Sequence, residues 1–289
     1  MSLFAGAFQQ GCFYGIVSVG VYLTFRILRI PDLTADGAFT LGGSTSASLI
    51  LANVPVLALP LSFVAGCGAG FVTAFLQIKL RVVPILAGFL TMSSLYTVNL
   101  AIQGGAPNLS LLRTKTLFNL LPFLSKKESQ FLWPLLFCLL IFLFFTLFLH
   151  TEKGLEIRAA GNNPKMAQAQ GINVAQAKTL ALMLANGAIA LAGGLASQHQ
   201  GYTDINTGSG SLLVGLAGVI LGEAIFPTNR LGWRLASIMA GAILYQLLLA
   251  VVVRYSFLPA YTFKLVAAVL IACTIGISHI KKSPQNDEL

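Results

Sequence analysis

The sequence predicts an all-α, polytopic membrane protein with about nine transmembrane spans arranged as an inverted repeat. Three observations carry this prediction. The 289 residues are 56% hydrophobic and only 9% charged, against roughly 25% charged residues in soluble domains. Uncharged apolar runs long enough to cross a bilayer, which takes about 20 residues, recur along the chain. A glycine-spaced polar motif also occurs twice, which indicates an internal repeat.

The predicted spans follow from the positions of the apolar runs. They cover residues 4–25, 36–53, 56–77, 83–103, 131–149, 179–199, 210–226, 235–253 and 263–280. The second and seventh spans are short and could be broken or partly re-entrant. We expect one transmembrane domain over residues 1–289. It comprises a first repeat half (1–103), an outer loop (104–130), a linking span (131–149), a cytoplasmic segment (150–178), a second repeat half (179–280) and a cytoplasmic tail (281–289).

The basic residues predict the orientation, because cytoplasmic loops carry an excess of Lys and Arg. An odd number of spans places the termini on opposite sides. With the tail inside, most of the 18 basic residues fall on the cytoplasmic side, and the outer loop 104–130, which also carries basic residues, is the weak point. The sequence therefore predicts an N-terminus outside and a C-terminus in the cytoplasm.

The repeat is predicted from two similar stretches. PDLTADGAFTLGG (31–43) and DINTGSGSLLVGLAG (204–218) both place an acid and a threonine before glycine-spaced apolar residues. They lie five spans apart and so would run in opposite directions through the bilayer. Inverted repeats place a substrate route at the repeat interface. Chance similarity is the alternative.

Acidic residues near the inner face are the first candidates for a gate. Asp32 and Asp36 precede or open the second span, where a carboxylate is stabilised by the positive end of a helix dipole. Glu223 ends the seventh span, close in sequence to Arg230 and Arg234. It either forms an ion pair with one of these arginines or braces the cytoplasmic gate.

Four neutral amides lie within or near the spans. Polar groups at membrane depth usually face a helix bundle or a water-filled path instead of lipid. Either they form hydrogen bonds between helices, or together they line a path for a small polar solute. The four residues are Asn99, Gln103, Asn186 and Gln198.

The cytoplasmic segment TEKGLEIRAAGNNPKMAQAQGINVAQAK (151–178) has its own pattern. Asn163 and Pro164 are typical of an N-cap followed by proline at the first helical position. We expect a short helix over 164–170 that Gly171 ends in the left-handed conformation. A second short helix, over 155–160, is expected to stop at Gly161.

This segment has two interpretations. Its alanines, at positions 159, 160, 167 and 169, are small enough to let another backbone approach, which is typical of a docking surface. The alternative is an ordinary cytoplasmic loop with well-capped helices.

The sequence contains no motif for chemistry. It has no G-x-x-x-x-G-K-[ST] motif for binding ATP, no H-E-x-x-H, no G-x-S-x-G and no clustered His, Cys and carboxylate residues. We expect no catalytic residues, no metal and no cofactor. The net charge of +9 is explained by the loop residues, so nucleic acid is not an expected partner. If ATP drives this protein, another polypeptide must hydrolyse it.

The residues resemble the membrane permease subunits of ABC importers, in the branch of the branched-chain amino acid and ribose permeases. GLEIRAAGNNPKMAQAQGIN (154–173) is similar to the cytoplasmic coupling region of that branch, and LALMLANGAIALAGGL (180–195) to the span after it. The match is tighter to permeases that are paired with tryptophan/tyrosine-type binding proteins. That pattern is seen in residues 25–43, 198–223 and 241–254, whereas 104–131 matches little.

The resemblance implies a permease subunit in the inner membrane that is not itself an enzyme. It implies a path for a small polar solute, with an amino acid, including an aromatic one, as the expected substrate. The implied partners are cytoplasmic ABC ATPase subunits, an extracytoplasmic substrate-binding protein, a second copy of the chain and membrane lipid. The implied ATPase-coupling residues are Arg158, Gly161, Asn163, Pro164, Lys165, Ala167 and Gly171, with Arg158 and Lys165 as polar contacts.

Two other classes stay open at this point. An ion-coupled secondary transporter could also have inverted repeats and a midplane site, but the acids here gather near the inner interface instead. A channel-like or structural membrane protein is the third reading. Transport by the chain alone under an ion gradient, without ATP, would favour either of these.

Overall fold

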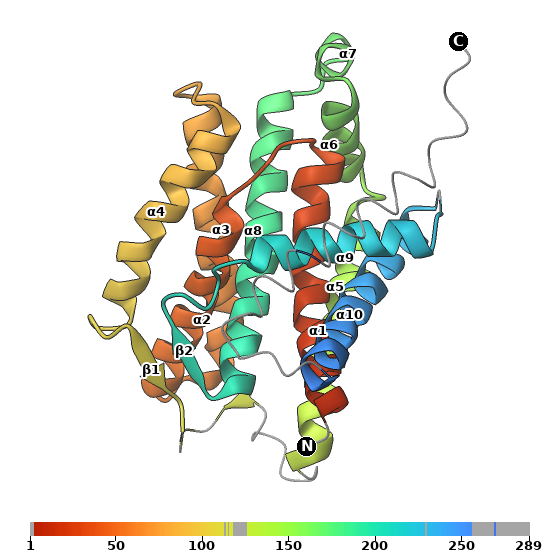
Figure 1. Cartoon of the computed structure of the whole chain (residues 1–289). Coiled ribbons are helices and arrows are strands. Elements are labelled where there is room, and N and C mark those ends of the chain that lie inside the picture. Colours follow the sequence, from red (N-terminus) through yellow and green to blue (C-terminus); the bar gives the residue numbers. More distant parts are fainter. Residues whose placement is uncertain are drawn as a thin grey trace.

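The computed structural model describes residues 3–112, 114, 116–117, 126–228, 230–255 and 269. These residues form a helical bundle with one small two-stranded sheet (Figure 1). In chain order the elements are α1 (Leu3–Val21), the π-helix η1 (Tyr22–Ile27), α2 (Thr34–Leu51), α3 (Pro55–Ile78), α4 (Pro84–Ile102), β1 (Asn108–Ser110), α5 (Lys126–Phe148), α6 (Glu152–Asn162), α7 (Pro164–Ala169), α8 (Val174–Gln200), β2 (Tyr202–Asp204), α9 (Ser211–Ile225) and α10 (Leu231–Tyr255).

Five of the described helices, α3, α4, α5, α8 and α10, are long and apolar enough to cross a membrane. Each predicted segment up to residue 253 contains a helix, and the boundaries differ by a few residues. The first is shorter than predicted as a regular α-helix, because α1 passes into η1 at Tyr22. The predicted ninth span (263–280) and the tail lie outside the described residues, except for Val269.

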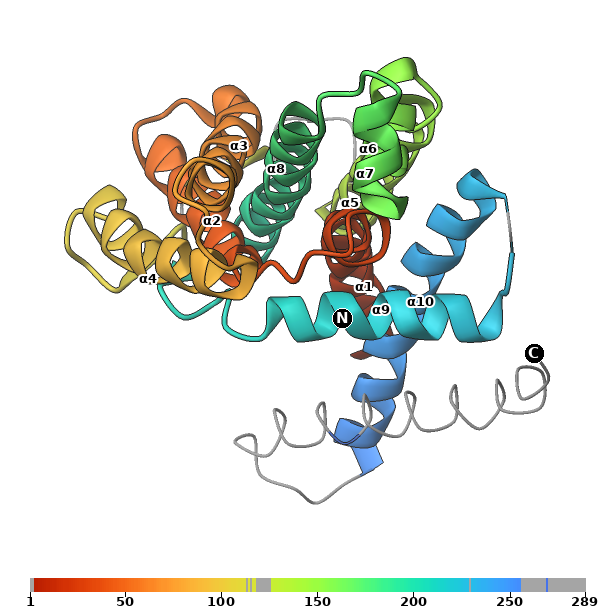
Figure 2. The same cartoon turned by 90° about the horizontal axis from the view of Figure 1, so that it is seen from above.

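Helix α8 lies at the centre of the bundle. Seen from above, it stands between α2 and α3 on one side and α1 and α5 on the other (Figure 2), and most of its length is buried. Its small residues allow this, because lipid supplies little hydrophobic force between helices and close packing must hold them together. Gly42 on α2 faces the backbone of Ala190, and Gly66 on α3 faces that of Asn186, with no room for a methyl group at either glycine.

Glycine pairs spaced by four residues pack within the chain. A methyl group at most of these glycines would meet the backbone of a neighbouring helix. The pairs are Gly66 and Gly70 of α3 against α8, and both Gly11 and Gly15 of α1 and Gly218 and Gly222 of α9 against α10. Small residues at this spacing are typical of close helix crossings.

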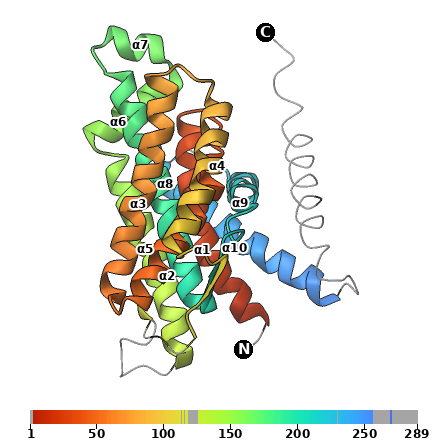
Figure 3. The same ribbon diagram turned by 90° about the vertical axis from the view of Figure 1, so that its left-hand side faces the viewer.

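Helix α9 lies across the bundle instead of along it. It crosses in front of the long helices in Figure 1, runs in the same direction in Figure 2 and is seen end-on in Figure 3. Its 15 residues extend about 22 Å, less than the hydrocarbon core of roughly 30 Å. Residues 210–226 therefore form the predicted helix but not a straight span along the bundle, and this agrees with the alternative that the seventh span is broken or partly re-entrant.

A small two-stranded sheet closes the opposite end of the bundle from α7 (Figure 1). β1 pairs antiparallel with β2, with Asn108 opposite Asp204 and Ser110 opposite Tyr202. The strands join the predicted outer loop to the segment after α8, which the sequence did not predict. We call the two ends of the molecule the α7 end and the sheet end.

Candidate functional site

Helix α7 is a short capped helix at one end of the molecule. The side chain of Asn163 accepts a hydrogen bond of 3.1 Å from the backbone N–H of Met166, and Pro164 occupies the first turn. Gly171 follows with a φ of +84°, a conformation that glycine adopts without a steric cost. The predicted N-cap, proline position and left-handed glycine are confirmed, and the helix ends at Ala169.

The surface of α7 differs from the predicted one. Met166 is 58% exposed, whereas Ala167 is 3% exposed and packs into the hydrophobic core of its own chain. Lys165 and Gln168 are exposed. The prediction that Ala167 belongs to an open docking surface is therefore wrong. The exposed face of α7 consists of residues next to Ala167, namely Lys165, Met166 and Gln168.

Helix α6 is longer than predicted and ends differently. It begins after Thr151, whose hydroxyl accepts from the Gly154 N–H, and continues to Asn162. Gly161 does not stop the helix. It lies against the backbone carbonyl of Ile27 in η1, where a side chain would overlap that carbonyl. The glycine thus allows α6 to pack directly on the end of the first helix.

Asp32 is buried between η1 and α2. Its carboxylate accepts hydrogen bonds from the Thr34 N–H (2.9 Å) and from Nδ2 of Asn186 (2.7 Å) on α8. Burial raises the pKa of Asp32, and the hydrogen bonds from Thr34 and Asn186 lower it by less. Thr34 extends the contacts to Thr73 of α3, with 2.7 Å between the two hydroxyl oxygens. Asp32 therefore links the start of α2 to α8, and Thr34 links α2 to α3.

Asp36 caps a distant helix. Its Oδ1 accepts from the Leu212 N–H (2.8 Å) and the Ser211 hydroxyl (3.0 Å), and its Oδ2 accepts from the Gly210 N–H (3.0 Å). The N-cap residue of α9, Gly210, has no side chain to do this. The first backbone N–H groups of a helix need such acceptors.

The two motifs of the predicted repeat meet at this point. Besides the Asp36 contacts, the Thr40 hydroxyl accepts from the Gly208 N–H at 3.1 Å. Residues 31–43 and 204–218 therefore lie side by side. They meet because the chain after β2 runs into the bundle before α9 begins (Figure 1).

The four amides lie inside the chain and hold α2 to its neighbours. Each is at most 3% exposed. Asn99 donates to the Gly37 carbonyl at 3.4 Å, Gln103 contacts the Ser44 hydroxyl at 2.7 Å, and Gln198 donates to the Ser46 hydroxyl at 2.9 Å. Together with Asn186, they make the helix–helix contacts that were one of their two interpretations. None of the four lines the cavity between η1, α6 and α10.

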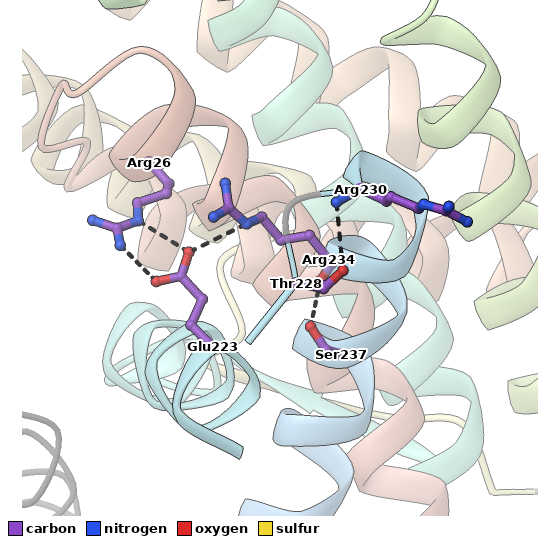
Figure 4. A network of polar contacts seen from close by, with 6 residues as sticks. All are labelled: Arg26, Glu223, Thr228, Arg230, Arg234 and Ser237. Carbon is purple, nitrogen blue, oxygen red and sulfur yellow. Dashed lines mark hydrogen bonds and ion pairs between the residues drawn. The ribbon is translucent and has the colours of Figure 1, made fainter. Parts of the chain in front are cut away.

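Glu223 pairs with an arginine that the sequence did not single out. Arg26 of η1 donates to both carboxylate oxygens, from Nε at 3.0 Å and from Nη2 at 2.8 Å, and Arg234 lies 4.0 Å away on the other side (Figure 4). Arg230 points away from the carboxylate in the same view. The predicted ion pair is present with Arg234 and absent with Arg230, and the closest partner is Arg26.

Helix α9 is thus held by charge at both ends, through Asp36 at its start and Arg26 at its end. A signal for Arg26 existed in the sequence, since the stretch 25–43 was part of the resemblance. The partner of Arg26 could not be known from the sequence, because Arg26 and Glu223 are separated by 197 positions.

Among the described residues, no group of His, Cys, Asp or Glu side chains is arranged to hold a metal ion.

Apolar helices of membrane length, polar contacts confined between them and a short capped helix at one end define a multi-pass membrane permease. A family model described as the branched-chain amino acid transport system permease component matches residues 3–275. The chain belongs to this family, whose members are permease components of ABC-type transport systems and not enzymes.

Two curated relatives support the assignment. The chain is 34% identical over 284 residues to a tyrosine transport system permease protein of Clostridioides difficile, covering 98% of this chain and 94% of the relative. It is 25% identical over 215 residues to the probable branched-chain amino acid transport permease protein LivH of Methanocaldococcus jannaschii, covering 69% and 66%.

A solved structure shares the fold. A chain of PsaBC from Streptococcus pneumoniae in complex with Fab superposes with a TM-score of 0.58. The match covers 95% of this chain and 91% of that chain, at 15% sequence identity.

Proposed function

We propose that this permease conducts an amino acid, with tyrosine or a similar aromatic amino acid as the substrate. The observation that carries the substrate is the match to the tyrosine transport system permease protein over nearly the full length of both chains. The stretches that resemble permeases paired with tryptophan/tyrosine-type binding proteins support it. Under this proposal, a separate extracytoplasmic protein delivers the amino acid, and a separate cytoplasmic ABC ATPase drives its passage.

The ATPase docks on α7. This helix lies between two long apolar helices, α5 and α8, projects from the end of the bundle (Figure 1) and is fixed by its caps. A rigid, exposed helix can transmit force because its caps prevent unwinding. Lys165 and Met166 form the contact surface, and Asn163, Pro164 and Gly171 set the shape of the helix. Coupling then requires that the ATPase dock differently in its two nucleotide states.

Helix α9 is the element that the docking moves. It touches α2 through Asp36 and the α7 end through Arg26 of η1. Gly161 of α6 packs on the carbonyl of Ile27, the last residue of η1. A displacement of α6 and α7 is therefore transmitted to Arg26, and from there to Glu223. Through these contacts Glu223 stabilises the cytoplasmic gate, which is the role that we propose for it.

The path is lined by the exposed polar face of α4. Ser93, Ser94 and Thr97 are exposed near the middle of this apolar helix, and polar groups at that depth seldom face lipid. Apolar residues such as Phe89 and Leu90 are also exposed on α4, whereas every exposed residue of α5 whose burial is described is apolar. A second copy of the chain would complete the path opposite α4. The buried amides, including Asn99 and Gln103, hold α4 and α2 together behind this face.

The topology is part of the same proposal. The α7 end is cytoplasmic and the sheet end faces outward, with the N-terminus outside and the C-terminus inside. A ninth span over 263–280 and an inverted repeat remain part of this proposal, and the contact between residues 31–43 and 204–218 is where the two halves would meet.

The direct test is the uptake of labelled tyrosine by cells that carry or lack the gene. We expect uptake to depend on the gene and to be inhibited by unlabelled tryptophan or tyrosine more than by leucine. Equal uptake in both strains would exclude this substrate. Tyrosine transport by the purified chain in liposomes, driven by an ion gradient without ATP, would contradict coupling to an ATPase.

A further inference from the structure

The α7 end contains a cavity of about 760 Å³ for which the proposed transport cycle names no ligand. Its walls come from η1, α6 and α10, and α7 contributes none of its lining residues. Four arginines line it, namely Arg26, Arg29, Arg158 and Arg234. Arg158, which the family resemblance gave as a polar contact of the ATPase, lies on α6 and lines this cavity.

The positive charge of the cavity is only partly balanced. Glu223 pairs with Arg26 and lies 4.0 Å from Arg234. Arg29 contacts an amide oxygen, Oδ1 of Asn162, at 3.4 Å. In the part of the chain that the structure describes, no carboxylate lies within ion-pair distance of Arg29 or Arg158, and Glu156 on the nearby α6 pairs with Lys153. The cavity thus holds more cationic groups than the described residues neutralise.

The backbone at this wall is unusual. Residues 22–27 form a π-helix, a geometry that is rare and frequent at functional sites. Arg29 has a φ of +56°, which is uncommon for a residue with a side chain. These two departures bring Arg26 and Arg29 to the same cavity. Strain of this kind persists where the surrounding structure requires it.

Apolar side chains adjoin the arginines. Phe25 and Leu155 line the cavity, and Leu155 is 52% exposed. Trp233, the neighbour of Arg234, is 69% exposed, and exposed tryptophans in membrane proteins are enriched at the level of the lipid headgroups. A ligand that fits both features carries a negative group beside a hydrocarbon body.

We propose that this cavity binds the phosphate headgroup of an anionic phospholipid. Basic pockets between membrane helices are suited to such headgroups, and guanidinium groups bind phosphate through paired hydrogen bonds. Arg29 and Arg158 supply the free charges, while Arg26 and Arg234 remain tied to Glu223. A bound lipid would therefore lie beside the ion pair that ends α9 without replacing it.

Native mass spectrometry of the full chain in neutral detergent tests this assignment. The chain is titrated with dioctanoyl phosphatidylglycerol, and separately with dioctanoyl phosphatidylcholine. We expect preferential binding of the anionic lipid. The double variant Arg29→Gln/Arg158→Gln should weaken that binding about thirtyfold, and each single variant about fivefold, at roughly one charge contact each. The single variants keep the test informative if the double variant does not fold.

The matched control removes two other positive charges at exposed positions in the connection between α3 and α4, as Lys79→Gln/Arg81→Gln. It should leave the affinity for phosphatidylglycerol within about twofold of the unchanged chain. Equal loss in the control and cavity variants would overturn the site, and so would equal binding of the two lipids.

Two further outcomes would reassign the cavity. Displacement of phosphatidylglycerol by inorganic phosphate at equal concentration would show that the site takes a free anion, which overturns the lipid. If the cavity variants keep the lipid but no longer copurify with the ATPase, the arginines bind an acidic segment of that partner instead. Retained fold is checked by thermal unfolding.

Discussion

The carboxylate of Asp36 accepts a hydrogen bond of 2.8 Å from the backbone N–H of Leu212, a residue that follows it by 176 positions. The start of α9 is therefore capped by α2. Because α9 crosses the bundle, this contact fixes where the crossing begins, and the Arg26–Glu223 pair fixes where it ends. Both contacts are polar and lie between elements that come together only in the folded chain.

Removal of the cap should release the start of α9. We expect Asp36→Ala to lower the free energy of unfolding by about 1–2 kcal/mol and to reduce transport per folded molecule. Asp36→Asn, which keeps an oxygen acceptor, should retain more of both. Asp204→Ala is the control, since that side chain accepts only from the nearby Asn206 N–H. Unchanged melting temperature and transport in Asp36→Ala would show that the contact is dispensable.

The pairing of Glu223 can be measured with a double-mutant cycle. We expect Glu223→Gln and Arg26→Gln to be coupled by about 1 kcal/mol in unfolding free energy, since the pair is bidentate but partly exposed. Arg230→Gln should show no coupling to Glu223→Gln, because its side chain points away. If Glu223 also braces the gate, Glu223→Gln should lose transport in well-folded protein. Coupling to Arg230 in place of Arg26 would contradict the observed geometry.

The docking surface of α7 is tested at its exposed residues. Met166→Glu should abolish copurification of the ATPase and ATP-dependent uptake without loss of folding, whereas Met166→Leu should be nearly neutral. Leu80→Glu, at another exposed apolar residue near the same end, is the control. Retention of the ATPase by Met166→Glu would exclude α7 as the contact.

Two other changes in this segment act through stability. Ala167→Glu should destabilise the chain by about 2 kcal/mol or more, because it buries a charge. Gly171→Val should cost about 1–2 kcal/mol at its positive φ. Thermal unfolding of the purified variants measures both effects. A loss of ATPase binding by either variant with no change in melting temperature would contradict the burial of Ala167 or the need for glycine at 171.

Water access to α4 tests the proposed path. In a background without the native cysteines, Thr97→Cys should react with a water-soluble thiol reagent, and tyrosine should slow the reaction. Leu139→Cys, on the exposed apolar face of α5, should react poorly because lipid surrounds it. Equal labelling at the two positions would remove α4 from the path.

Side-specific labelling decides the orientation. Leu112 is exposed close to strand β1, and Met166 is exposed on α7. Leu112→Cys in intact cells should react with an impermeant reagent, and Met166→Cys should react only after the membrane is opened. A reporter fused after Leu289 should be cytoplasmic. The reverse labelling pattern would invert the proposed topology.

The sequence by itself determined the features that depend on a few neighbouring residues. The cap at Asn163, the proline at the first helical position and the left-handed Gly171 were predicted because each is satisfied within three or four residues of backbone. The apolar runs located the long helices for a similar reason, since every backbone group in lipid must find its partner within the same helix. Small residues at a spacing of four are typical of close crossings, but the spacing alone does not say which helix they meet.

Only the tertiary structure decided the partners of the polar residues. Asp36 was expected to act on its own helix and caps α9, and Ala167 was expected on an open surface and is buried. Glu223 was expected to pair with Arg230 or Arg234; it lies 4.0 Å from Arg234 and pairs most closely with Arg26. The antiparallel pairing of β1 with β2 likewise joins segments far apart in the chain. Amphipathic periodicity and caps specify a helix, but the partner of a carboxylate depends on how helices cross, which is a property of close packing among all of them.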